Sequence, residues 1–139
     1  MKKFISMALA LCLLGSSTLS VNAATNTTYA NTPSASGTGS VTLASVTSVS
    51  ATGSTVASAG PKGSINGVSV SVTLTYGVAN TTKTVTATES APANQKSVTA
   101  TAPYTYVNSI SATGSHYYAA YNTATGIGET ATWSSYVTP

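Results

Sequence analysis

The sequence predicts an all-β fold, a small β-sandwich of about seven to eight antiparallel strands, with a barrel as the second choice. Three observations support this prediction. Apolar and hydroxyl residues alternate with a period of two from Val41 onward, clusters of Gly, Asn and Pro interrupt the alternation at short intervals, and no stretch combines helical periodicity with helix-forming residues.

The N-terminus is typical of a bacterial signal peptide. Lys2 and Lys3 precede an apolar run from Phe4 to Leu14, and the small residues of Val21-Asn22-Ala23 follow. We therefore expect residues 1–23 to be removed by cleavage after Ala23 and the product to be secreted or associated with the cell surface. The apolar run is shorter than the roughly 20 residues that span a bilayer, so no integral membrane segment is expected. The single cysteine, Cys12, lies in this run, so the processed chain has no disulfide or thiol chemistry.

Residues 24–40 are rich in Ser, Thr, Gly and Asn and show no periodicity. This composition predicts a flexible leader, followed by a β-sandwich domain over residues 41–139.

The clearest strand is predicted at 68–76, where five apolar residues alternate with four hydroxyl residues, so that each set lies on one face. Weaker alternation predicts the other strands at 41–49, 82–88, 97–102, 105–112, 115–121 and 129–137. The turns are expected at the Gly, Asn and Pro clusters near residues 60–63, 77–80, 91–94 and 125–128.

An internal similarity indicates a duplication. Residues 46–54 and 107–115 are identical at seven of nine positions, at an offset of 61, and both copies end in Ala-Thr-Gly-Ser. We expect this tetrapeptide to form a tight hairpin connection in each copy, within two related three-strand units near 41–77 and 102–138. The alternative is chance repetition of short words in a chain of low complexity.

The chain has few groups for reaction chemistry. It has five Lys and two Glu, with no Arg or Asp, and the segment after Ala23 keeps three Lys and two Glu, a net charge of +1. A nucleic-acid partner is not expected, because such proteins need several cations on one face. No motif indicates a cofactor, and His116, Glu89 and Glu129 lack metal-ligand spacing.

We expect no catalytic residues and no enzyme. Glu89 and Glu129 are the only pair that could serve glycoside hydrolysis, and both positions are typical of solvated charges at strand edges. Serines are too numerous to single out a nucleophile, and no Gly-x-Ser-x-Gly motif occurs. For His116, a hairpin residue with one face in water is favoured over a ligand contact.

The aromatic residues give the strongest functional signal. Six of the eight tyrosines and the single Trp lie in the last 36 residues. On a strand, Tyr117 and Tyr121 share one face and Tyr118 points the other way, and Trp133 and Tyr136 are opposed in the same manner, so some of these rings should lie at the surface. The candidate binding residues are Tyr117, Tyr118, Tyr121, Trp133, Tyr136 and His116. The alternative is that these rings fill the core.

The sequence thus favours a non-enzymatic protein, secreted or held at the cell surface, that binds a carbohydrate or a protein through its aromatic C-terminal part. One alternative is a self-assembling extracellular matrix or fibre subunit, because charge is low and β-propensity is high. A small secreted toxin or bacteriocin is a further alternative.

Overall fold

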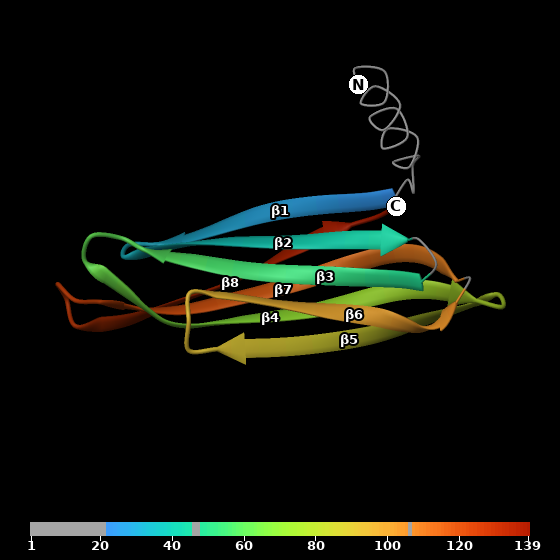
Figure 1. Ribbon diagram of the computed structural model, residues 1–139. Coiled ribbons are helices and arrows are strands. Elements are labelled where there is room, and N and C mark those ends of the chain that lie inside the picture. The colour runs from blue at the N-terminus through green and yellow to red at the C-terminus, as the bar shows by residue number, and fades with distance from the viewer. Residues whose placement is uncertain (1–21, 46–47, 106) are drawn as a thin grey trace, which may run out of the picture.

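The computed structural model describes residues 22–45, 48–105 and 107–139 and shows two packed β-sheets (Figure 1). Their eight antiparallel strands are β1 (Asn22–Thr32), β2 (Ala35–Ser45), β3 (Ser48–Ala59), β4 (Gly63–Val78), β5 (Thr81–Ala91), β6 (Gln95–Thr105), β7 (Asn108–Asn122) and β8 (Ile127–Val137). The predicted sandwich is confirmed. The predicted signal peptide lies almost wholly outside the described residues.

One sheet has the strand order β1-β2-β3-β6 and the other β5-β4-β7-β8. The second sheet lies behind the first, with β8 and β7 behind β1 and β2 and with β5 beside β6 (Figure 1). The chain therefore changes sheet after β3, after β5 and after β6. No helix that could cross a membrane occurs in the described part of the chain.

The alternating sequence explains how β4 separates its two faces. Its residues Val68, Val70, Val72 and Leu74 are buried between the sheets, whereas the hydroxyl residues between them point outward. On the outer side, Ser71 bonds to Thr88 (2.8 Å) and Thr73 to Thr86 (2.9 Å) across the β4–β5 ladder. Such cross-strand hydroxyl pairs stabilise adjacent strands and use hydrogen-bonding groups that water would otherwise satisfy.

The predicted flexible leader at 24–40 is wrong, because these residues lie in β1, in β2 and in the turn between them. The inward positions of β2 here are held by Ala35, Gly37 and Gly39 instead of branched aliphatics, so the sequence shows no alternation of apolar residues. A Cβ at Gly37 would come within 2.7 Å of the Tyr118 ring. Glycine at position 37 therefore leaves space for the Tyr118 ring and does not indicate a flexible backbone.

The predicted hairpins at the repeated Ala-Thr-Gly-Ser are also wrong. Residues 51–54 lie inside β3, and residues 112–115 lie inside β7. Gly53 and Gly114 are packed against side chains of the facing sheet or of their own sheet and do not form turns. The two strands also have different neighbours, since β3 lies between β2 and β6 and β7 lies between β4 and β8. The segments 41–77 and 102–138 are therefore not equivalent three-strand units.

The core consists of two apolar clusters separated by a polar layer. The larger cluster contains Leu43, Val72 and Leu74, and the smaller one contains Val68 and Tyr118 with Trp133 packed against it. Between them lie the buried side chains of Thr55, His116 and Ser135, which we call the polar layer. Because buried polar groups must be paired, this layer fixes how the two sheets face each other.

Candidate functional site

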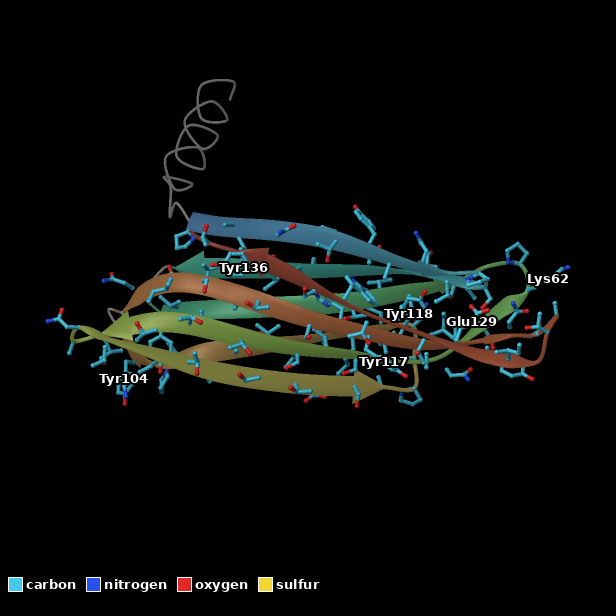
Figure 2. All side chains as sticks on the ribbon, turned by 180° about the vertical axis from the view of Figure 1, so that it is seen from behind. Lys62, Tyr104, Tyr117, Tyr118, Glu129 and Tyr136 are labelled. Atoms are coloured by element: carbon cyan, nitrogen blue, oxygen red, sulfur yellow. The ribbon has the colours of Figure 1, made fainter. Side chains whose placement is uncertain are left out.

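The outer face of the sheet β5-β4-β7-β8 is covered with hydroxyl side chains in register. Ser90, Ser69, Tyr117 and Thr132 lie directly opposite one another on the four strands and form one row. On the side of this row towards Thr113, the next two rows also consist of hydroxyl residues, whereas Gly67, Ala119 and Gly128 lie on the other side. At the described outward positions of these strands there is no charged side chain, because Lys83 and Glu89 of β5 stand opposite the inward-facing residues of β4. Figure 2 shows this sheet from its outer side, with Tyr117 and Tyr136 labelled.

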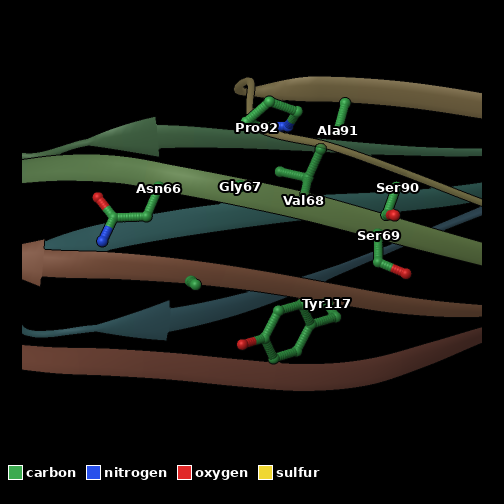
Figure 3. Close-up of a pocket in the computed structure, with 9 residues that line it drawn as sticks. Asn66, Gly67, Val68, Ser69, Ser90, Ala91, Pro92 and Tyr117 are labelled. Atoms are coloured by element: carbon green, nitrogen blue, oxygen red, sulfur yellow. The ribbon is translucent and has the colours of Figure 1, made fainter.

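A shallow hollow of about 310 Å³ lies on this face around Tyr117 (Figure 3). Tyr117 on β7, Asn66 and Ser69 on β4, and Ser90 on β5 supply its main polar groups, with Pro92 beyond the end of β5. We call this feature the Tyr117 hollow; its lining consists of Asn66, Gly67, Val68, Ser69, Ser90, Ala91, Pro92, Tyr117 and Ala119.

A bulge in β4 shapes one end of the Tyr117 hollow. The register between β4 and β7 shifts between Ile65 and Gly67, which leaves Asn66 as an extra, exposed residue. Bulges of this kind re-aim a side chain and often occur beside binding sites. A Cβ at Gly67 would lie 3.0 Å from the carbonyl oxygen of Ala91, so glycine keeps the backbones of β4 and β5 close at this point.

The lining of the hollow is chemically suited to a neutral, polar ligand with apolar faces. It offers a flat tyrosine ring, two serine hydroxyls and one amide, and none of its residues is charged. Sugars carry hydroxyls around their rims and C–H groups on their faces, so they match both kinds of surface.

The predicted binding residues divide between surface and core. Tyr117, Tyr121 and Tyr136 are exposed on this outer face, with 36%, 39% and 54% of their surface accessible. Tyr118 is fully buried, and its hydroxyl donates to the carbonyl oxygen of Ala35 at 3.1 Å. Trp133 packs in the core against the rings of His116 and Tyr118, with centroid distances of 5.4 and 5.7 Å. The candidate surface set is therefore corrected to the three exposed tyrosines.

His116 does not have the water-facing position that the sequence favoured. It lies in the middle of β7 with 1% of its surface exposed, Nδ1 lies 2.9 Å from Thr55 Oγ1 and Nε2 lies 2.7 Å from Ser135 Oγ. Burial lowers the pKa of His116 from 6.5 to about 4, because a charged imidazole would lose its hydration. The histidine and both hydroxyls are almost completely enclosed, so this arrangement is a hydrogen-bonded core network.

The two glutamates are kept far apart by the fold. Glu89 lies on β5 and pairs with Lys96 at 3.4 Å, whereas Glu129 lies on β8, at the opposite edge of the same sheet. Glu129 accepts bonds from Ser34 Oγ (2.6 Å) and the Ser34 amide (3.0 Å), and the Ser34 hydroxyl bond is the main reason that its pKa falls to about 2. No cluster of three or more His, Cys, Asp or Glu that could hold a metal occurs among the described residues.

Several residues of the hollow could not be found from the sequence. Ser69 and Ser90 are two of many serines, and only the strand register brings them beside Tyr117. Asn66 lies next to a glycine in an alternating stretch, and that glycine is the one local sign of the bulge. Tyr29, 71% exposed on the outer face of the other sheet, lies outside the predicted set of binding residues, because the sequence predicts a flexible leader for its segment.

Comparison with protein-family models, with curated proteins and with solved structures finds no match for this chain.

Proposed function

We propose that this protein is a non-enzymatic binding protein that holds a neutral carbohydrate in the Tyr117 hollow. The observation that carries the proposal is the composition of the hollow, which combines an exposed tyrosine ring with the Ser69 and Ser90 hydroxyls and the Asn66 amide, and no charge. A tyrosine ring contributes a large contact area at low entropic cost, and the polar groups around it orient the ligand.

The surroundings support a neutral ligand over a charged one. On the side of the hollow towards Thr113, the outward residues of the sheet all carry hydroxyl groups. The described outward positions of this face include no cation to pair with a phosphate, sulfate or carboxylate. With the predicted export signal at residues 1–23, the place of action would be outside the cell, at glycans of the cell surface or its surroundings.

The test is a binding measurement with a matched control. Isothermal titration with cello-, chito- and malto-oligosaccharides should show binding of at least one series by the wild-type protein. Tyr117→Ala should weaken that binding at least roughly tenfold, equivalent to about 1.4 kcal/mol, because the ring supplies the main contact area. Tyr29→Ala removes an exposed tyrosine from the opposite face and should leave the affinity unchanged.

Both variants should melt at the wild-type temperature, since both rings lie at the surface. Equal weakening by Tyr29→Ala and Tyr117→Ala, or the absence of binding to all three series, would contradict the proposal.

Self-assembly into a fibre is a second candidate, favoured by a difference between the two open edges of the sandwich. The edge formed by β5 and β6 carries Lys83, Glu89 and Lys96, which discourage pairing with another chain. On the other edge, the described residues Ala24–Thr32 of β1 have no charged side chain and no proline. An unprotected edge strand of this length can add a strand from a second copy.

Sedimentation velocity over a range of concentrations tests this candidate. If β1 is the contact, the wild-type protein should form larger species as concentration rises, and Thr27→Lys, which places a charge at an exposed position of β1, should prevent this. A wild-type protein that stays monomeric at every concentration would rule the assembly role out.

A further inference from the structure

Three exposed tyrosines form a staggered line on the outer face of the sheet β5-β4-β7-β8, two on β7 and one on the adjacent strand β8. Tyr117 and Tyr121 are four residues apart on β7, and Tyr136 on β8 stands directly opposite Thr113, which is four residues before Tyr117. The three rings are thus spaced evenly along the strand direction, about 13–14 Å from one to the next, because a strand advances about 3.4 Å per residue. We call this line the tyrosine track.

From this spacing we propose that the ligand is an extended neutral polysaccharide that lies along the tyrosine track and contacts all three rings. The proposal rests on carbohydrate binding at the Tyr117 hollow and goes further, because it names the form of the ligand. A single sugar ring can cover only one tyrosine, whereas the track is about 27 Å long and requires a chain of several sugars to span it.

The surface between the rings leaves such a chain room to lie flat. Ala119 separates Tyr117 from Tyr121, and Ser115 and Ser134 lie between the level of Tyr117 and that of Tyr136. Gly128, which stands opposite Tyr121, has open space where a Cβ would be. Small and hydroxyl side chains therefore form the floor of the track, and they can exchange hydrogen bonds with sugar hydroxyls.

The absence of charge along the track argues for a neutral polymer. The outward positions of β7 and β8 carry only hydroxyl, aromatic, alanine and glycine side chains in the described structure from Ser111 to Tyr121 and from Gly128 to Tyr136. An anionic polysaccharide would meet no cation there, and a cationic one would meet no carboxylate, because Glu129 faces inward to Ser34.

Repeated contacts along one ligand have a measurable consequence. Once one part of a chain is bound at the Tyr117 hollow, contact with Tyr121 or Tyr136 becomes intramolecular, so affinity rises with chain length without any change in the first contact. A ligand that occupied the hollow alone would gain nothing from additional sugars.

The experiment compares oligosaccharides of increasing length, from disaccharide to hexasaccharide, in whichever cello-, chito- or malto- series binds. The wild-type affinity should rise roughly tenfold or more over this series. Tyr121→Ala and Tyr136→Ala should each bind the disaccharide as the wild type does and should each lose a clear part of the gain at the longer lengths, because each variant keeps the contact on the other side of Tyr117. Tyr29→Ala should keep the full gain, because its ring lies on the other sheet.

The outcomes separate this inference from the proposed function. Two outcomes would contradict binding along the tyrosine track but leave binding at the Tyr117 hollow supported. In the first, Tyr117→Ala abolishes binding while the wild-type affinity is independent of oligosaccharide length. In the second, Tyr121→Ala and Tyr136→Ala keep the full gain in affinity. If the folded wild-type protein binds no oligosaccharide of any length, both proposals fall.

Discussion

At the scale of single residues, the size of the inward-facing side chain decides how the two sheets approach. Where β4 contributes valine and leucine, the strand is recognisable in the sequence, whereas β2 contributes Gly37 and Gly39 beneath the rings of Tyr118, His116 and Trp133. A Cβ at Gly39 would lie within 2.6 Å of Trp133 Nε1. The glycines of β2 therefore leave space for the large rings of the other sheet.

His116 gives the protein a specific dependence on pH. Its pKa is about 4 in the folded chain and 6.5 when exposed, so the unfolded chain binds more protons between these values and stability falls as the pH drops through this window. A shift of this size corresponds to about 3 kcal/mol of unfolding free energy.

Urea unfolding at several pH values measures the dependence on His116. The wild-type midpoint should decrease as the pH falls from 6.5 towards 4, and His116→Gln should start from a lower midpoint and show little change over the same range. Glu129 causes a separate loss of stability, because its pKa is about 2 in the folded chain and 4.5 when exposed. This loss begins only when the pH falls below about 4.5. An equal slope in the wild type and in His116→Gln would show that His116 is not the group responsible.

At the scale of elements, one carboxylate connects the first hairpin to the last. Glu129 of β8 holds both the hydroxyl and the amide of Ser34 in the β1–β2 turn, and it also accepts a bond from Asn122 Nδ2 at 3.2 Å. The bonds to Ser34 link residues 95 positions apart, so β1 and β2 are secured to the second sheet by a side chain. Two further side-chain bonds join β1 to this sheet, from Asn26 Nδ2 to the carbonyl oxygen of Tyr136 at 2.6 Å and from the Tyr118 hydroxyl to Thr32 Oγ1 at 3.2 Å.

Glu129→Gln should loosen this hairpin without disrupting the sandwich. Glutamine keeps the shape but loses the charge that strengthens both Ser34 bonds. The amide of Ser34 should therefore exchange with solvent faster in the variant, measured by hydrogen–deuterium exchange. The amide of Ala112, a buried residue of β7, serves as the control and should exchange at the wild-type rate. Unchanged exchange at Ser34 would mean that the turn is held by other contacts.

Whether a strand can be predicted from the sequence depends on the residues that face inward from it. The strand pattern at 68–76 was correct because every inward residue of β4 there is a branched aliphatic or an aromatic. Strand β1 and the first half of β2 are not predicted, because their inward residues include Gly, Ala, Thr and Asn. The second half of β2, where Val41 and Leu43 face inward, lies within the strand predicted at 41–49. The Ala-Thr-Gly-Ser segments resemble turns because Gly53 and Gly114 make space for side chains inside strands. Alternation in the sequence reveals a strand only where the inward-facing side chains of that strand are large and apolar.

The same limit applies to the candidate site. Alternation placed Tyr117 and Tyr121 on one face, and the structure confirms that both are exposed. It could not decide which face of β7 is outward, so Tyr118 and His116 were included in the candidate set although they lie in the core. The partners Ser69 and Ser90 follow from strand order, which depends on three changes of sheet that no local pattern encodes.

At the scale of the whole molecule, the sandwich separates a small core from two broad, neutral, hydroxyl-covered faces. The described charged residues lie in a loop or on the edge strands β5, β6 and β8. Among the residues that the structure describes, the face of β5-β4-β7-β8 carries the three exposed tyrosines of the track and the Tyr117 hollow. This difference between the two faces supports the proposal that a ligand binds to one face of the sandwich.

Chemical-shift mapping tests this claim most directly. Amide resonances of the ¹⁵N-labelled protein would be followed during titration with the longest oligosaccharide of the series that binds. We expect the largest shifts at Ser69, Ser90 and Tyr117, with further shifts at Tyr121 and Tyr136 and none at Tyr29 on the opposite face. Shifts centred on the outer face of β1-β2-β3-β6, or scattered over both faces, would contradict the account.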